Sequence, residues 1–237
     1  MTEVHPAVRS GLQRLLEKRR ELVGSGARPL GWKAAFGSSQ AKQRLGLPHL
    51  LAGFLTDRTV LPSGVTVSVR GWRRPVAEPE VAVRLGQDVL PDSSPEAVAA
   101  AVTGVAPAIE LVDPDRAPEE DLEAVLAGNI FHRYAVVGDM RTVPFTGSLA
   151  GTVGRVFRNG GESAGVEDLE AFPGRVVDVL GEMARVLASV GERLRAGDVV
   201  ICGSVIPPLS LDPADRSVEF ELAGLGRVVV GLSGEQP

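Results

Sequence analysis

Two glutamates stand two residues apart in the stretch 75–86, which reads PVAEPEVAVRLG. With the two-residue repeat of a strand, Glu78 and Glu80 project side by side from one face, and the opposite face is apolar. Two ionised carboxylates this close repel each other, so the pair requires solvent, a cation or a shared proton. Pro79 between them has no N–H, which predicts an edge strand or a bulge and therefore an interrupted strand ladder at the pair.

A third carboxylate, Glu110, lies within an apolar run over 105–112 that is typical of a buried strand. An unpaired buried glutamate is costly or becomes protonated, so Glu110 needs a partner. If it meets Glu78 and Glu80, the three form an oxygen site that suits Mg²⁺ or Mn²⁺ better than zinc. The alternative is two solvated strand glutamates and one separately paired glutamate, and the spacing alone favours neither.

The elements that must position these carboxylates are a mixture of strands and helices. The patterns predict helices over 5–23, 38–45, 94–105, 174–190 and, in acidic form, from residue 117. Strands are expected over 29–37, 59–65, 75–86, 105–113, 134–137, 199–202, 217–222 and 226–232, with a hairpin over 152–168. We therefore expect an α+β fold in which residues 1–49 form a small helical region packed on a β-rich core of residues 50–237.

Composition excludes several classes of protein. The chain has 237 residues, 44% of them hydrophobic, enough to bury a full core. Its formal net charge is −5, from 25 basic and 30 acidic residues, which argues against a nucleic-acid partner. No apolar run has the length of a membrane span, so no membrane role is expected. The single cysteine, Cys202, fits a reducing compartment as a small core residue, which predicts a cytoplasmic protein.

Lysine in an apolar strand is the next candidate for chemistry. Lys33 lies within the predicted strand over 29–37. It either points to water, which is the commoner arrangement, or keeps its ammonium for an anionic ligand.

Four short motifs occur in an order that resembles the fumarylacetoacetate hydrolase superfamily. They are GWK at 31–33, EPEVA at 78–82, AIELVD at 108–113 and LRAGDVVICGS at 194–204. The chain is most similar to the branch of 2-keto-4-pentenoate hydratases and 4-oxalocrotonate decarboxylases, over roughly residues 5–232. The resemblance implies a mixed β-roll with flanking helices, a small-molecule 2-oxo acid substrate and bound Mg²⁺ or Mn²⁺.

The resemblance also assigns roles to individual residues. It makes Glu78, Glu80 and Glu110 the metal ligands, and Lys33 a residue that binds substrate or transfers a proton. Asp57 falls near a catalytic acidic residue of the family. Gly203 and Ser204 match a Gly-Ser loop that can hold a substrate carboxylate, or is only a turn.

One segment departs from the family pattern. Where the hydratases carry an Asp-Asn-Ala-Ser-like sequence, this chain reads GNIFH over 128–132, so that only Asn129 survives as a substrate-binding candidate. Phe131 makes the neighbourhood more apolar and is expected to line the pocket. His132 is a candidate acid or base, because imidazole titrates near neutrality, although a lone histidine is more often structural.

The leading hypothesis is a Mg²⁺-dependent lyase, most similar to a 2-keto-4-pentenoate hydratase, that acts through a metal-bound enolate of a small 2-oxo acid or its dienol. A 4-oxalocrotonate-type decarboxylase is the first alternative. A C–C hydrolase or a biosynthetic isomerase or cyclase on the same scaffold is the second, and a catalytically silent partner subunit is the third. A homo-oligomer is the general expectation for such enzymes.

Overall fold

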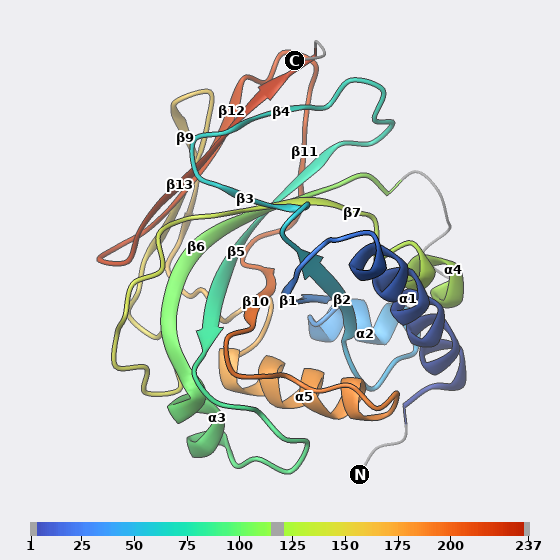
Figure 1. Cartoon of the computed structure of the whole chain (residues 1–237). Helices are drawn as coiled ribbons and strands as arrows, with labels where there is room; N and C mark the ends of the chain where they lie inside the picture. The colour runs from blue at the N-terminus through green and yellow to red at the C-terminus, as the bar shows by residue number, and fades with distance from the viewer. Residues whose placement is uncertain (1–3, 115–120, 235–237) are drawn as a thin grey trace.

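Strand β5, which carries Glu78 and Glu80, lies near the middle of a large mixed sheet (Figure 1). The computed structural model describes residues 4–114 and 121–234. In spatial order the first sheet contains β2 (Leu51–Thr56), β1 (Pro29–Ala35), β10 (Val199–Ser204), β5 (Val76–Leu85), β6 (Val102–Val112), β7 (His132–Val137) and β3 (Val60–Pro62), while β11 (Leu209–Ser210) also pairs with β5. The strongly curved β6 gives this sheet its rolled shape.

A second sheet packs across the first. Its strands, in spatial order, are β4 (Thr66–Ser68), β13 (Gly226–Ser233), β12 (Ser217–Leu222), β8 (Gly154–Arg158) and β9 (Gly161–Val166). Strands β12 and β13 contact β6 of the first sheet. Asn159 and Gly160, both at positive φ, make the tight turn between β8 and β9 that the sequence predicts.

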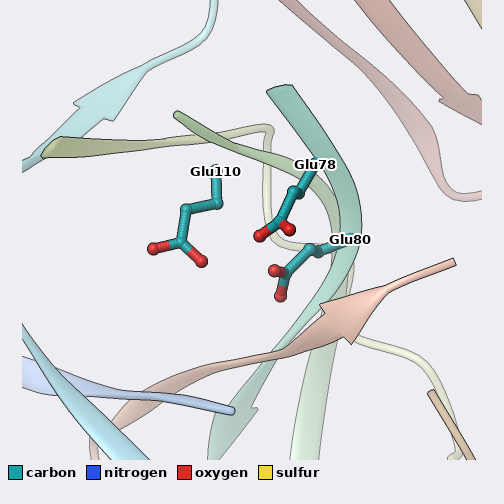
Figure 2. Close-up of side chains that lie close together, drawn as sticks. All are labelled: Glu78, Glu80 and Glu110. Atoms are coloured by element: carbon teal, nitrogen blue, oxygen red, sulfur yellow. The ribbon is translucent and has the colours of Figure 1, made fainter. Parts of the chain in front are cut away.

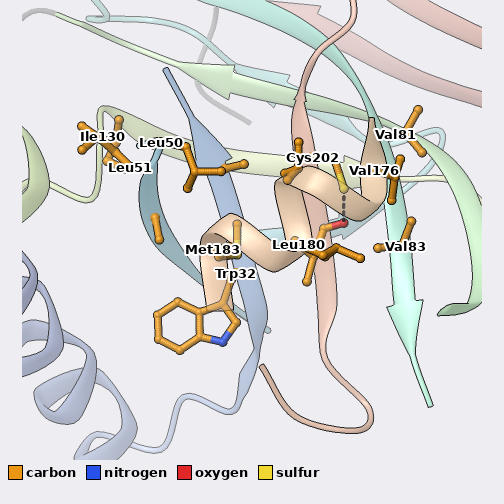
Figure 3. Close-up of a cluster of buried hydrophobic side chains, with 14 of the residues drawn as sticks. Trp32, Leu50, Leu51, Val81, Val83, Ile130, Val176, Leu180, Met183 and Cys202 are labelled. Carbon is orange, nitrogen blue, oxygen red and sulfur yellow. Dashed lines mark hydrogen bonds between the residues drawn. The ribbon is translucent and has the colours of Figure 1, made fainter. Parts of the chain in front are cut away.

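Five helices flank the sheets in the described part of the chain. They are α1 (Pro6–Gly24), α2 (Ser39–Leu45), α3 (Pro95–Ala101), α4 (Leu122–Ala127) and α5 (Val176–Ala188). Helix α5 lies across β10 and β2 and places Leu180 and Met183 in the core (Figure 3). Burying a side chain of this size contributes about 1.5–3 kcal/mol, so the apolar stripe of α5 holds it on the sheet. The α+β roll with flanking helices, expected from the resemblance, is confirmed.

The helix predicted over 94–105 is too long. Helix α3 begins after the Ser94 cap, whose Oγ accepts a hydrogen bond from the amide of Ala97 at 3.3 Å, and it ends at Ala101. Strand β6 starts directly at Val102, where β-branched residues favour the extended chain and pairing with β5 begins. The acidic helix predicted from residue 117 begins outside the described residues, and α4 covers Leu122–Ala127.

The stretch before residue 50 contributes more than helices. Helix α1 packs closely on α4, where a Cβ added to Gly11 would lie 2.8 Å from the Cβ of Leu126. Strand β1 pairs in parallel with β10 and antiparallel with β2, so this stretch also supplies a strand of the large sheet. The predicted boundary at residues 49 and 50 thus falls between α2 and β2. In the described residues, no helix combines the length and apolarity that crossing a membrane requires.

Candidate metal centre and active-site pocket

The three glutamates converge because of the register between β5 and β6. Glu78 on β5 is directly opposite Glu110 on β6, and Glu80 follows on the same face of β5. One ligand oxygen from each of the three carboxylates lies within 4.8 Å of the others. Figure 2 shows the side chains turned toward a common point between the strands. The sequence left open whether Glu110 meets the other two, and the structure brings all three together.

Pro79 lies beside a bulge rather than on an edge strand. The register of β10 against β5 shifts between Ile201 and Ser204, and the amide of Val205 donates to the carbonyl of Pro79 at 2.8 Å. The shift turns the amide of Gly203 toward Glu80, so that it donates to Oε2 at 2.7 Å. The interruption of the ladder that proline predicts is therefore what orients the second glutamate.

Lys33 and His132 share one oxygen of Glu110. The Lys33 ammonium donates to Oε1 at 2.5 Å, and His132 Nδ1 lies 2.6 Å from the same atom. All three side chains are 1% exposed. Lys33 therefore does not point to water. Because a carboxylate only accepts hydrogen bonds, Nδ1 of His132 carries the hydrogen when Glu110 is ionised.

Burial and mutual repulsion raise the pKa of two of the carboxylates, whereas neighbouring donors lower the pKa of the third. Burial, and then the charge of Glu110, raise the pKa of Glu78 to about 7. Burial also raises the pKa of Glu80, with the charges of Glu110 and Glu78 acting in the same direction. For Glu110 burial acts upward too, but the Lys33 charge and the His132 hydrogen bond outweigh it and lower the pKa. Without a cation, these three groups resist carrying three negative charges together.

A pocket of about 370 Å³ opens beside Glu78 and Glu80. Lys33, Glu78 and Glu80 lie in its lining, and aromatic and apolar side chains form much of the remainder: Phe36, Val76, Val112, Ile130, Phe131, Phe172, Pro173 and Pro208. Arg44 and Arg74 also line it, and both are exposed. A polar floor with apolar walls suits a small acid that carries a hydrocarbon tail.

A turn of unusual backbone geometry borders this pocket. Asn129, Ile130 and Phe131 have φ values of 59°, 53° and 61°, so three consecutive residues other than glycine are left-handed. Each such residue costs about 1–2 kcal/mol, and a branched Cβ as in Ile130 is among the least tolerant. Backbone held in this way requires strong support from its surroundings and often marks a functional site.

The structure separates the predicted site residues into two groups. Lys33, Phe131, Gly203 and Ser204 line the pocket with Glu78 and Glu80. Asp57 does not line it and instead pairs with Arg28, whose Nε lies 2.9 Å from Oδ2.

Several predicted residues form hydrogen bonds within the protein, including two that line the pocket. Both ends of the Asn129 amide bind the main chain of Phe54, at 2.9 and 3.0 Å. His132 contacts Glu110 and does not line the pocket. The Gly203 amide, expected to face a substrate carboxylate, donates to Glu80, and the Ser204 hydroxyl lies 2.7 Å from the carbonyl of Ile206.

Sequence reasoning missed several residues of the pocket. Phe36 falls in the predicted strand over 29–37 but directly follows β1, Phe172 lies in a turn, and Arg74 precedes β5 in a loop. Asp113, 2% exposed, accepts from the amides of Arg73 and Arg74 at 3.2 and 2.9 Å and thereby fixes this loop. The signal that the sequence offered for this loop contact was an aspartate directly after an apolar strand, where an acidic side chain needs a partner.

Comparisons with known proteins show what this chain is similar to. The model of the family described as "Fumarylacetoacetate (FAA) hydrolase C-terminal" matches residues 33–232. A 4-oxalocrotonate decarboxylase from a Pseudomonas species is 30% identical over 95% of this chain and 86% of its own length. A 2-hydroxyhexa-2,4-dienoate hydratase from Comamonas testosteroni is 29% identical over 95% and 87%.

The fold is shared with solved structures. A 4-oxalocrotonate decarboxylase from Pseudomonas putida G7, complexed with magnesium and adipate, superposes with a TM-score of 0.82 at 24% identity, over 92% of this chain and 83% of that one. A fumarylpyruvate hydrolase from Pseudomonas aeruginosa, in complex with Mn²⁺ and pyruvate, gives a TM-score of 0.68 at 15% identity, over 88% and 91%.

Proposed function

Because this chain belongs to the fumarylacetoacetate hydrolase family, we propose that it is a divalent-metal-dependent lyase that acts on a small 2-oxo acid or its dienol. Hydration is the activity that we propose first, ahead of decarboxylation. The observation that carries the proposal is the convergence of Glu78, Glu80 and Glu110 beside a buried lysine, where Glu78 and Glu80 line an apolar-walled pocket.

The residues present fit a divalent ion. Glu80 Oε1 and Glu110 Oε2 are buried without a hydrogen-bond partner among the described residues. An unpaired buried carboxylate oxygen is costly, and a cation at the common point would satisfy both atoms. Carboxylate oxygens are the ligands that Mg²⁺ and Mn²⁺ prefer, and no cysteine competes for the role, since Cys202 is the single cysteine. Glu78, Glu80 and Glu110 would hold the ion.

Residues of the chain would take the other roles in catalysis. A bound Mg²⁺ or Mn²⁺ would act as a Lewis acid that stabilises the negative charge developing when a 2-oxo acid enolises. Lys33, which lines the pocket, can bind an anionic oxygen of the substrate or exchange a proton with it. The aromatic wall keeps water away from the hydrocarbon end, and Phe131 lies in that wall.

A decarboxylase is the second candidate, and Arg74 favours it. Arg74 lines the pocket and is exposed, and its backbone amide donates to Asp113. An exposed cation at this place can pair with a second carboxylate at the far end of a substrate. The similarity to a hydratase and a decarboxylase at nearly equal identity leaves the choice to experiment.

The test follows the products of purified protein. A 2-hydroxydienoate and a 2-oxo dicarboxylate are each incubated with Mg²⁺, with Mn²⁺ and with a chelator, beside Glu80→Gln as a control. We expect metal-dependent addition of water to the dienoate, detected as a mass gain. Release of CO₂ from the dicarboxylate alone would establish the decarboxylase. Cleavage of a carbon–carbon bond next to a ketone would establish the hydrolase. A protein that binds no divalent ion and turns over neither compound would be a silent partner subunit.

We propose further that the enzyme works in the cytoplasm as a homo-oligomer. The single, buried cysteine supports a reducing compartment. Closed symmetric assemblies are the general case among soluble enzymes. Light scattering of the purified protein measures the assembly directly, and a monomeric mass would contradict it.

A further inference from the structure

The left-handed turn over residues 129–131 is anchored on two sides. The side-chain amide of Asn129 accepts from the Phe54 amide and donates to the Phe54 carbonyl, as a backbone strand would. A Cβ on Gly53 would lie 2.7 Å from Asn129 Oδ1 and 2.8 Å from Lys33 Cγ, so only glycine permits this approach. On the other side, the amide of Asp113 donates to the carbonyl of Phe131 at 3.0 Å.

The turn brings two groups to the metal centre. The carbonyl of Ile130 accepts from the Lys33 ammonium at 3.3 Å, and His132 reaches Glu110 Oε1. The His132 side chain is 1% exposed and does not line the pocket, whereas it contacts Glu110 directly. We therefore expect His132 to act on the reaction through Glu110.

The two oxygens of Glu110 have different surroundings. Oε1 receives the hydrogen bonds of Lys33 and His132, while Oε2 is buried with no partner among the described residues. In Figure 2 one oxygen of Glu110 faces the other two glutamates and the other points away from them. Two donors on Oε1 prevent the carboxylate from rotating, which leaves Oε2 as the atom offered to a cation.

We propose that His132 is a positioning residue, which locks the Glu110 carboxylate so that Oε2 is the metal ligand, and that the left-handed turn exists to deliver it. The inference rests on the metal site of the proposed function. Lys33 alone is a weak lock, because its ammonium ends a flexible four-carbon stem and is also needed by the substrate. The imidazole is planar, buried and independent of substrate, so it holds Glu110 through the whole cycle. Partners of this kind typically change metal affinity ten- to hundredfold.

The test measures Mn²⁺ affinity by calorimetry on the full chain. His132→Leu removes the donor and should weaken Mn²⁺ binding about ten- to hundredfold. His132→Asn places an amide N–H near the position of Nδ1 and should restore most of the affinity. Val136→Ala, at another buried position of β7, is the control for general loosening of the strand and should bind Mn²⁺ as the wild type does. If His132→Leu does not fold, His132→Ala replaces it.

The outcomes separate this inference from the proposed function. If wild type binds Mn²⁺ and His132→Leu binds it equally well, His132 does not position the ligand and the inference fails alone. Equal weakening by Val136→Ala, or no recovery in His132→Asn, would also overturn it. If wild type itself binds no divalent ion, the proposed function fails first. Weakening in His132→Leu, recovery in His132→Asn and an unchanged control together establish the role.

Discussion

The pocket is built from two kinds of backbone, and they contribute different things. Its floor comes from regular strand pairing, in which the register of β5 with β6 sets Glu78 opposite Glu110. Much of its wall comes from turns, and Phe36, Ile130 and Phe131, all at positive φ, line it. Strand pairing repeats a geometry that many sequences can adopt, whereas such turns require individual support. We therefore expect the strands to supply the general metal chemistry and the turns to decide substrate choice and the fine placement of side chains.

Lys33 joins the two regions, and its removal should have the largest effect. It donates to Glu110 on the strand side and to the Ile130 carbonyl on the turn side. Lys33→Met should lower kcat about 10²–10⁴-fold, the usual cost of losing a positioned proton donor. Mn²⁺ affinity should stay the same or increase, because a positive charge beside the site is lost. Steady-state kinetics and calorimetry check both parts, and a joint loss of turnover and Mn²⁺ binding would assign Lys33 to structure.

Glu110→Ala tests the strand region by itself. Two remaining carboxylates hold a divalent ion poorly. Losing the ligand Glu110 should weaken Mn²⁺ binding more than losing its partner His132 does, that is, by more than about hundredfold. Glu162→Ala on the exposed strand β9 is the matched control, and it should bind as the wild type does. Circular dichroism should show the fold retained. Unchanged affinity in Glu110→Ala would remove Glu110 from the metal site.

The same division explains what the sequence could predict. A two-residue period placed Glu78 and Glu80 on one face, and that face is confirmed, because period 2 follows from the strand itself. Proline at 79 correctly indicated an interrupted ladder, although of its two causes only the bulge applies. Helix α3 was extended too far because alanine and valine at its end suit either state, and pairing with β5 decides.

The turn region had no comparable signal. None of the three residues at positive φ, Asn129, Ile130 and Phe131, is a glycine. Their residue types therefore do not predict three left-handed residues in succession. The amide of Asn129 was expected to face substrate, yet it binds Phe54, a residue 75 positions away. Contacts of this range depend on tertiary structure, as does the meeting of His132 with Glu110. The role of each of these side chains in catalysis stays a prediction.

Phe131→Ser tests the turn region at its contact with the pocket. If the phenyl ring shapes the wall, wild type should prefer a 2-hydroxydienoate with an extended distal end over a short one by roughly ten- to a few hundredfold, since apolar pockets discriminate by about 1–3 kcal/mol. The substitution should narrow that preference and leave Mn²⁺ affinity unchanged. The measurement is kcat/KM for both compounds in both proteins. Full activity of wild type on the short compound, unaffected by the change, would place the ring outside the substrate's path.

The last prediction is the smallest and concerns protons on the strand region. The pKa of Glu78 is raised to about 7 by burial and by Glu110, and that of Glu80 is raised as well, so below neutrality a metal must displace protons to bind. Mn²⁺ affinity should therefore rise about tenfold per pH unit for each proton displaced as pH increases from 6 toward 8. For the protein without metal, the stability of the fold should change with pH in the opposite direction. Its carboxyls bind more protons folded than unfolded between pH of about 4.5 and 7, so its stability should fall as pH rises through that window.

Calorimetry with Mn²⁺ at pH 6, 7 and 8 measures the first trend, and thermal unfolding at pH 5, 6 and 7 measures the second on the same preparation. Glu78→Gln supplies the control, because an amide does not titrate, and its affinity should be weaker overall with a flatter dependence on pH. Phe131→Ser should keep the wild-type slope, since the turn region carries no proton that the metal displaces. An affinity that stays constant from pH 6 to 8 in wild type would mean that the Lys33 ammonium already holds Glu78 and Glu80 ionised, and the strand region would then be ready for metal without proton release.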